Sequence, residues 1–314
     1  MNQHEEQKKN YSIKAYAKKF RSELNVKEMA QKNNEPVTAY AKRVKKLAKK
    51  EAQNISKKTW ENKAMHGQYP KRIQEADVDF EKTNKWLKGS GLKAETEGLI
   101  IAAQDQSLAT RLYHHRIIKD GTSPLCRLCN KFEESIDHIL SGCPELAKTE
   151  YIHRHNNAAA YIHWKILNYY KIKTVEKWYE HKPQTVTENE RVTILWDMQI
   201  HTDKTIKANK PDIVIKDKKE KTCLLIDMAV PSERNTSIKV VEKLSKYKDL
   251  EIEVTKMWGM KTQTVPVVIG ALGLVKKGLE KHTNKIPGNI NLTEIQKIAL
   301  LGSAHILRRV LSIK

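Results

Sequence analysis

The 314-residue sequence contains no long hydrophobic run. Its longest apolar stretch, residues 265–275, is interrupted by Pro266, Gly270 and Gly273. A membrane-spanning helix needs about 18 or more apolar residues, and a signal peptide needs an apolar segment near the N-terminus. Because the first thirty residues are polar and charged, we expect neither feature. The sequence favours a soluble, intracellular protein that does not span a membrane.

Cysteine is also scarce, with four residues in the whole chain. A protein of this length that depended on disulfides would be expected to contain more, so a disulfide framework is not expected. Three of the four, Cys126, Cys129 and Cys143, fall within eighteen residues of one another. This clustering indicates a metal site.

Acidic residues are outnumbered by basic ones, with 37 Asp and Glu against 58 Lys and Arg, a net charge of +21 and a pI near 9.6. Such a balance favours a polyanionic partner, either nucleic acid or an acidic membrane face. The excess is concentrated in residues 1–60, which hold sixteen Lys or Arg, six Glu and no Asp.

Residues 39–55 have the pattern of a basic amphipathic helix. Apolar residues recur near helical spacing, and basic residues occupy much of the remaining circumference. The basic positions are Lys42, Arg43, Lys45, Lys46, Lys49 and Lys50. Two interpretations remain open: a solvated helical face, or an arm that follows nucleic-acid phosphates. The arm would lose affinity steeply with salt, because bound counterions are released.

The rest of the chain changes from helical to strand periodicity. Helical patterns cover residues 84–118 and 151–170, on either side of the cysteine cluster. From residue 192, short β-branched segments predict strands at 192–196, 212–215, 222–226 and 265–269, with helices at 237–249 and 292–310. Strands followed by a helix, a further strand and a helix predict an α/β fold with a mixed sheet.

These patterns divide the chain into five predicted segments. They are a basic helical arm or linker at 1–118, a small zinc-binding module at 119–150, a helical connector at 151–185, an α/β core at 186–282 and a C-terminal packing helix at 283–314.

The cysteine cluster has the spacing Cys126-x₂-Cys129-x₈-His138-x₄-Cys143. Three thiols and one imidazole suit a closed tetrahedral zinc site, and the two-residue gap lets a tight turn direct both sulfurs at one ion. We expect the metal to supply most of the order of this segment, which looks poor in core residues. The alternative is four unrelated residues, two of them ordinary buried thiols. Cys223 lies in an apolar strand and is expected in the core.

Two aspartates form the second candidate site. Asp212 begins a predicted strand, and Asp227 follows after fourteen intervening residues inside a hydrophobic pattern, where an unpaired carboxylate is costly. Two such oxygen ligands suit Mg²⁺, which could activate water and neutralise charge on a phosphodiester. Lys243 and Lys246, three residues apart on a predicted helix, could orient the water or stabilise negative charge. The alternative is that these are ordinary strand-end acids and a solvated cationic face.

Taken together, these residues resemble the C-terminal part of polyproteins from site-specific non-LTR retrotransposons that encode a restriction-like endonuclease. The shared pattern runs from about Trp86 to the C-terminus. It comprises Ala102-Ala-Gln-Asp-Gln106, Cys126-Arg-Leu-Cys129, Asp137-His-Ile139, Ser141-Gly-Cys-Pro144, Tyr161-Ile-His-Trp164, Ile194-Leu-Trp-Asp197, Lys210-Pro-Asp212, Ile226-Asp-Met-Ala-Val-Pro231, Glu242-Lys243 with Lys246-Tyr247, and Pro266-Val-Val-Ile-Gly-Ala-Leu272.

The resemblance implies a PD-(D/E)xK-type nuclease core at 186–282, magnesium-dependent DNA nicking, and a zinc knuckle at 119–150 that handles nucleic acid during target-primed reverse transcription. Asp212 and Asp227 would bind the catalytic metal, and Lys243 or Lys246 would be the catalytic lysine. The expected partners are target DNA and the element's RNA, with no membrane partner, and the expected location is nuclear.

Two departures from the family pattern matter. Ala229 stands where the general nuclease pattern places lysine, so the lysine must come from the helix. No Tyr-x-Asp-Asp sequence occurs, so a polymerase centre is absent from this sequence. The chain therefore resembles a C-terminal fragment, with residues 1–118 matching the linker after a polymerase thumb.

The leading hypothesis is a metal-dependent DNA endonuclease. A second hypothesis is a catalytically inactive nucleic-acid-binding module, from either a decayed or a domesticated element. A third is an RNA-binding partner that acts in trans with a full-length retrotransposon polymerase.

Overall fold

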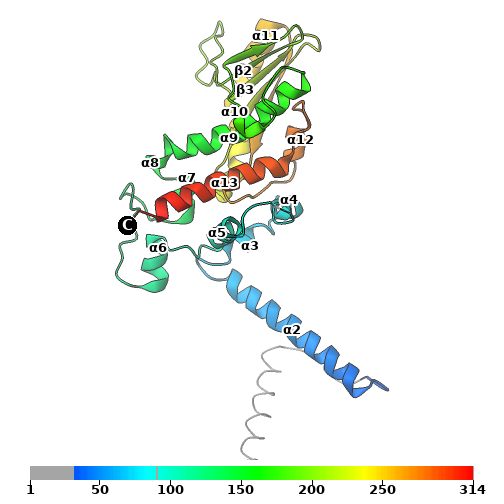
Figure 1. Ribbon diagram of the computed structural model, residues 1–314, viewed down its shortest axis with the longest axis vertical. Helices are drawn as coiled ribbons and strands as arrows, with labels where there is room; N and C mark the ends of the chain where they lie inside the picture. The colour runs from blue at the N-terminus through cyan, green and yellow to red at the C-terminus, as the bar shows by residue number, and fades with distance from the viewer. Residues whose placement is uncertain (1–31, 90, 314) are drawn as a thin grey trace, which may run out of the picture. The chain divides into compact units, whose positions relative to one another are not determined.

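The structure is a computed structural model that describes residues 32–89 and 91–313 (Figure 1). The chain divides into two compact units, Met1–Gln68 and Tyr69–Lys314. The division lies at residue 68, whereas the sequence pattern placed the first segment boundary at 118. Trp86 and Ile100 explain the difference, because both pack against Leu300 and Ala304 in the core of the second unit.

The first unit contains helix α2 (Val37–Glu61), which begins after Pro36 and confirms the predicted basic helix. No α2 residue is buried. Tyr40, Val44, Leu47 and Ala48 are half-buried along one side. The helix is therefore amphipathic, but it has no apolar core of its own.

The second unit is built around a five-stranded mixed sheet. Its strands are β1 (Val186–Glu188), β2 (Val192–Trp196), β3 (Ile213–Asp217), β4 (Thr222–Ala229) and β5 (Lys261–Val268), in the spatial order β1-β2-β3-β4-β5. The first four strands pair antiparallel, and β4 pairs parallel with β5. This confirms the predicted α/β class and the mixed sheet.

Helices α10 (Thr236–Lys246) and α11 (Lys248–Trp258) form the connection between the parallel strands β4 and β5. The longest helices of the unit are α9 (Glu150–Tyr169) and α13 (Leu292–Leu311), which lie side by side in Figure 1. The shorter α-helices are α3 (Gln68–Arg72), α4 (Phe80–Lys85), α5 (Ala94–Gln104), α6 (Arg111–Tyr113), α7 (Ile136–Ser141), α8 (Pro144–Ala147) and α12 (Leu279–Thr283). The remaining turns are η1 (His114–Ile118), η2 (Trp178–Glu180) and η3 (Glu233–Asn235).

The sheet is covered on both faces, and the period-two alternation of its strands supplies each face with apolar side chains. Ile213, Ile215 and Ile226 share a core with residues of α9 and α13. Val214 and Leu225 point to the other face, where they pack with residues of α11. The sheet is therefore the middle of three layers.

The helical pattern predicted over residues 84–118 is broken in the structure. Helix α4 ends at Lys85, and Gly89 and Gly91 both have positive φ before α5 begins. A second interruption separates α5 from α6. Glycine adopts such backbone angles without steric cost, which explains the first break.

No helix of the described residues is long and apolar enough to cross a bilayer.

Candidate functional site

The four ligands of the cysteine cluster, Cys126, Cys129, His138 and Cys143, converge in the structure. Their candidate ligand atoms all lie within 4.8 Å of one another. The Sγ atoms of Cys126 and Cys143 are 3.9 Å apart, and Cys129 Sγ lies 3.4 Å from His138 Nε2. Zinc–sulfur bonds of about 2.3 Å in a tetrahedron separate sulfurs by about 3.8 Å. The cluster therefore has the donor types and spacing of a zinc site.

Local backbone geometry explains this convergence. Asn130, with φ 52°, closes a turn in which its amide donates to the Cys126 carbonyl. His138 lies on α7, and Cys143 immediately precedes α8. Burial raises the pKa of the Cys143 thiol to about 12. A divalent cation would have to displace that proton on binding.

The module around the cysteine cluster has more core than its sequence suggested. Ile136, Ile139 and Leu140 are buried and share a hydrophobic cluster with Leu307 and Val310 of α13. The expectation that this segment is poor in core residues is therefore wrong, because the module buries its apolar residues against the C-terminal helix.

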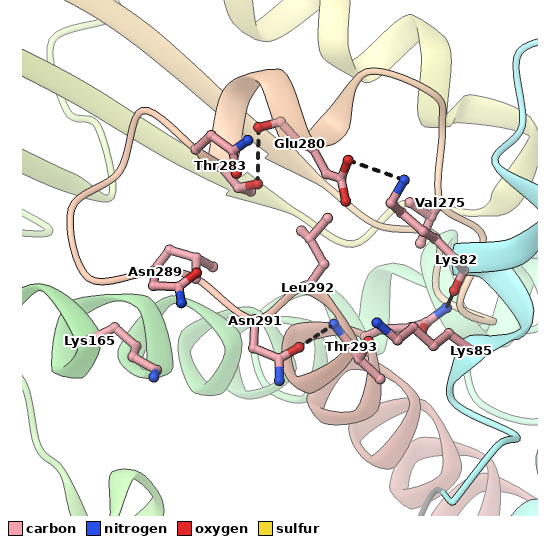
Figure 2. A pocket seen from close by; sticks show the side chains of 13 residues that line it. Lys82, Lys85, Lys165, Val275, Glu280, Thr283, Asn289, Asn291, Leu292 and Thr293 are labelled. Carbon is pink, nitrogen blue, oxygen red and sulfur yellow. Dashed lines mark hydrogen bonds and ion pairs between the residues drawn. The ribbon is translucent and has the colours of Figure 1, made fainter.

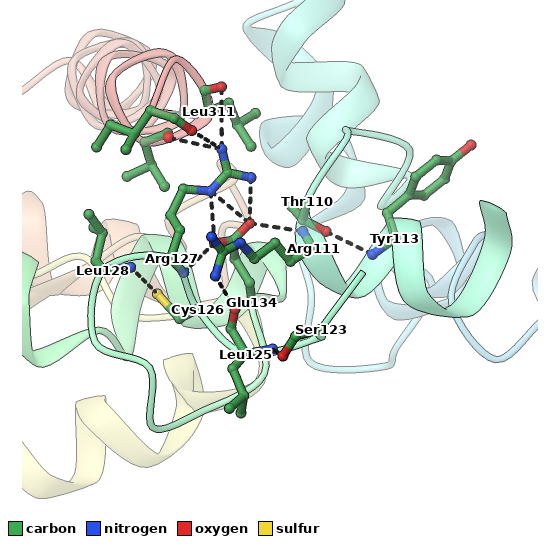
Figure 3. A network of polar contacts seen from close by, with 12 residues as sticks. Thr110, Arg111, Tyr113, Ser123, Leu125, Cys126, Arg127, Leu128, Glu134 and Leu311 are labelled. Atoms are coloured by element: carbon green, nitrogen blue, oxygen red, sulfur yellow. Dashed lines mark hydrogen bonds and ion pairs between the residues drawn. The ribbon is translucent and has the colours of Figure 1, made fainter. Parts of the chain in front are cut away.

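A buried ion pair reinforces this attachment (Figure 3). Glu134 is fully buried, and its carboxylate accepts from the guanidinium of Arg127 at 2.7 Å and from the backbone amide of Arg111 at 2.8 Å. Burial acts to raise the pKa of Glu134, but the bonds from Arg127 outweigh it and lower the pKa. Arg127 also donates to the carbonyl of Ile313 at 2.6 Å. The cysteine turn is thereby bonded to residues just beyond the end of α13.

The second candidate site, which we call the carboxylate site, contains Asp212, Asp227, Lys243, Tyr247 and His155. The antiparallel register that pairs Ile213 with Ile226 brings Asp212 opposite Asp227, one residue further along. Burial, and after it the nearby charge of Asp212, raises the pKa of Asp227. The two predicted metal-binding carboxylates therefore lie close together at one end of the β3–β4 pair.

Asp227 is almost completely buried and has two partners from the α10–α11 connection. The hydroxyl of Tyr247 donates to Asp227 Oδ1 at 2.6 Å, and the Lys243 ammonium pairs with Oδ2. Lys246 instead donates to the Tyr247 hydroxyl at 2.8 Å, with its ammonium 4.4 Å from the centre of that ring. Of the two candidate lysines, Lys243 is the one that contacts a carboxylate.

Asp212 is held from the opposite layer by His155 of α9. His155 Nε2 lies 3.0 Å from Asp212 Oδ2, which also accepts from the Met228 amide at 2.6 Å. Burial acts to lower the pKa of His155, but the bond to Asp212 outweighs it and raises the pKa to about 9. The same contact outweighs burial at Asp212 and lowers the pKa of that carboxyl. Asp212 therefore faces a cationic imidazole at neutral pH.

Two hollows give access to the carboxylate site. One, of about 300 Å³, is lined by His155, Ser232, Lys239 and Lys243 among others. The other, of about 510 Å³, is lined by His155 and Asp212 with Trp196 and Lys210 among others. Asp212 and Lys243 are thus each reached from a hollow, and His155 borders both.

The two sites differ as metal centres. Among the described residues, the cysteine cluster is the one group of three or more His, Cys, Asp or Glu side chains close enough to share an ion. The carboxylate site offers two carboxylates, a donor set that suits Mg²⁺ only when water or substrate phosphate completes the coordination.

The predicted nucleic-acid-binding residues all lie on α2. Lys42, Lys45, Lys46, Lys49 and Lys50 are exposed. Arg43 differs, because its guanidinium pairs with Glu35 at 2.8 Å and lies 5.6 Å from the Tyr40 ring centre. Five of the six positions thus present charge to solvent.

His155 and Tyr247 are the residues of the carboxylate site that sequence reasoning did not assign to it. Tyr247 is the last apolar position of the helical pattern at 237–249, and that pattern predicts a core residue there. His155 is one of twelve histidines and lies on a helix with other polar residues, so no spacing rule points to it.

No protein-family model matches this chain, and no curated protein matches it. The retrotransposon resemblance therefore depends on the sequence motifs alone.

Proposed function

We propose that this chain is a magnesium-dependent DNA endonuclease that hydrolyses a backbone phosphodiester at the carboxylate site, within a PD-(D/E)xK-type core. The observation that carries the proposal is the meeting of Asp212, Asp227 and the Lys243 ammonium at one end of the β3–β4 pair. A nuclease of this type needs that combination, two oxygen ligands and a cation, beside a surface that a phosphate can reach.

Each residue then has a definable task. Asp212 and Asp227 would hold Mg²⁺, which supplies charge neutralisation and lowers the pKa of attacking water. Tyr247 fixes the orientation of the Asp227 carboxylate, and His155 fixes that of Asp212. Lys243 neutralises Asp227 in the structure described here. Its ammonium would be free to stabilise the scissile phosphate once a metal replaced it.

The cysteine cluster would hold a structural zinc ion in this scheme, and the exposed lysines of α2 would contact phosphates of the DNA target or of an associated RNA. The motif resemblance supports an origin in a non-LTR retrotransposon polyprotein and a nuclear site of action.

The test is plasmid nicking by the purified chain with Mg²⁺ and with EDTA. We expect nicking with Mg²⁺ alone and its loss in Asp212→Asn, which keeps the size of the side chain but removes its charge. Asp203→Asn, at an exposed loop position, is the matched control and should nick normally. Undiminished nicking by Asp212→Asn would remove the assignment.

A second candidate is a nucleic-acid-binding module without catalysis. The observation that favours it is that Asp212 and Asp227 are both already paired with cations of the chain, His155 and Lys243. Binding with a steep salt dependence but no cleavage with Mg²⁺, Mn²⁺ or Co²⁺ would select this candidate. A role in trans beside a full-length polymerase would additionally require that the two proteins co-purify.

A further inference from the structure

A polar cavity of about 480 Å³ lies between α4, α9 and the start of α13 (Figure 2). Its lining includes Lys82, Lys85 and Lys165 together with Asn284, Asn289 and Asn291. Its one carboxylate, Glu280, pairs with Lys82 at 3.2 Å. Lys85 and Lys165 form no ion pair within the described part of the chain. In Figure 2, Lys85 and Lys165 come from opposite sides of the cavity. Because the lining holds three lysines and one carboxylate, it carries a net positive charge.

The fold holds these walls in place. Gly288 has φ 106°, and a Cβ there would lie 2.5 Å from the Lys165 carbonyl oxygen, so only glycine lets the asparagine-bearing loop lie against α9. Among the lining residues, the buried Gln296 donates through its side-chain amide to the carbonyls of Thr83 at 2.9 Å and Gly273 at 2.6 Å. The loop and helices around the cavity are therefore fixed by packing and hydrogen bonds.

A second hollow, of about 590 Å³, continues from the first. The two share Asn284 and Asn289 in their linings. The second hollow adds Lys261, which has no acidic partner among the described residues, and the ring of Tyr169, which is 52% exposed. Tyr169 packs edge-on against Tyr170 with ring centres 5.0 Å apart, so the exposed ring is supported from behind.

We propose that the two hollows form one groove that binds a single strand of nucleic acid, with phosphates at Lys85, Lys165 and Lys261 and a base on Tyr169. Spaced cations and a supported, exposed aromatic ring are the two features by which proteins bind single strands. A free phosphate ion would use the cations but not the ring. The joining of two hollows and the exposed Tyr169 ring therefore favour an oligonucleotide.

This groove lies apart from the carboxylate site. Its second hollow is lined by Asp217 and Thr222, at the opposite end of the β3–β4 pair from Asp212. At about 3.3 Å per strand residue, the five residues of β3 separate the two ends by roughly 16 Å. The groove would hold a strand without cutting it, so the proposal does not depend on the nuclease activity.

The test is fluorescence anisotropy with labelled single-stranded DNA and RNA of the same sequence, using the full chain in EDTA. We expect Lys85→Glu/Lys165→Glu to weaken binding of the DNA or the RNA oligonucleotide by tenfold or more. Tyr169→Ala should weaken the same binding by roughly tenfold. Lys173→Glu/Lys182→Glu makes the same charge change at exposed positions outside the groove and should weaken binding less than twofold. Comparison of the two oligonucleotides identifies the preferred strand.

Equal losses in the two double variants would overturn the proposal, as would inorganic phosphate that binds as tightly as the oligonucleotides. The milder pair Lys85→Gln/Lys165→Gln, checked by circular dichroism, separates loss of binding from misfolding. Magnesium-dependent plasmid nicking by Lys85→Glu/Lys165→Glu should persist. Its failure together with intact strand binding would count against the groove's independence.

Discussion

The cysteine cluster and the carboxylate site differ in how far apart their members lie in the sequence. The cysteine cluster takes four ligands from eighteen consecutive residues, so one turn and one short helix bring them together. The carboxylate site takes its residues from α9, the position just before β3, β4 and the α10–α11 segment, between His155 and Tyr247. The first site is determined by local spacing and the second by the tertiary fold.

The two sites also differ in charge. The four side chains of the cysteine cluster face one another. The nearby cation in Figure 3, Arg127, pairs with Glu134 and not with a member of the cluster. At the carboxylate site, His155 already pairs with Asp212, and Lys243 with Asp227. A metal would therefore complete the cysteine cluster but would compete with the protein's own cations at the carboxylate site.

The largest expected effect tests the cysteine cluster. Cys143→Ser should abolish stoichiometric zinc binding and lower the free energy of unfolding by several kcal/mol, since structural zinc contributes on the order of 10 kcal/mol in small modules. Zinc per chain by mass spectrometry and urea unfolding measure both effects. Cys223→Ala, at a buried cysteine outside the cluster, should keep its zinc. Full zinc retention by Cys143→Ser would show that the four side chains of the cluster converge for a reason other than zinc binding.

The next effect separates the two helix lysines. Lys243→Met should reduce nicking by about 10²–10³-fold, the usual loss when one charge-stabilising group is removed from a transition state. Lys246→Met should cost less than tenfold, because Lys246 reaches the Tyr247 hydroxyl and not a carboxylate. Single-turnover nicking rates provide the measurement. The reverse order would assign the catalytic role to Lys246.

A third prediction concerns Glu233, on the turn between β4 and α10. Burial raises its pKa to about 7 in the folded chain, from an ordinary value of 4.5. The folded pKa is the higher one, so this contribution to stability is complete below about pH 4.5 and is lost as pH rises through 7. We expect a decline of up to about 3 kcal/mol across that window.

Urea unfolding at pH 5 and pH 7.5 measures this decline in the free energy of unfolding. Glu233→Gln should make the decline smaller, whereas Glu176→Gln, at an exposed position, should leave it unchanged. The neighbouring Arg234 pairs with Asp137 of α7 at 3.3 Å, next to His138 of the cysteine cluster. The Glu233 turn is therefore in contact with the helix that carries His138. A wild-type slope in Glu233→Gln would refute the assignment to this carboxyl.

The smallest effect concerns the histidine that orients Asp212. His155→Gln should reduce nicking by about 10–100-fold at limiting Mg²⁺, as is usual when a group that orients a metal ligand is removed. The Mg²⁺ concentration for half-maximal rate should rise, and excess Mg²⁺ should restore part of the rate. His153→Gln, two residues away and exposed, is the control. An unchanged Mg²⁺ dependence in His155→Gln would limit His155 to a structural role.

Much of the fold follows from local patterns in the sequence. The buried strands β2, β3 and β4 and helix α13 were predicted because their apolar residues repeat with a clear period. Strand β1 was missed because it has three residues and none is buried. Strand β5 was predicted to begin at Val265, but it begins at Lys261, since its first residues alternate with exposed Lys261 and Gln263 and resemble a polar turn.

The candidate sites show the same limit. Local spacing was enough to predict the cysteine cluster. It could not distinguish Lys243 from Lys246, because residues three apart share a helix face. The contact of Lys246 with Tyr247 depends on tertiary packing. His155 could not be found, because its role exists only where α9 crosses the end of β4.

Pro266 in β5 has a consequence for self-association. Strand β5 is the last strand in the sheet order, and its pairing with β4 continues through Pro266, opposite Asp227. Proline has no amide hydrogen, so the outer rim of the sheet lacks one donor in the middle of the strand. A second molecule would find an interrupted template there for extending the sheet. The Thr264 amide on the same rim already donates to the Glu251 carboxylate, so β5 has few free donors for a strand added from another molecule.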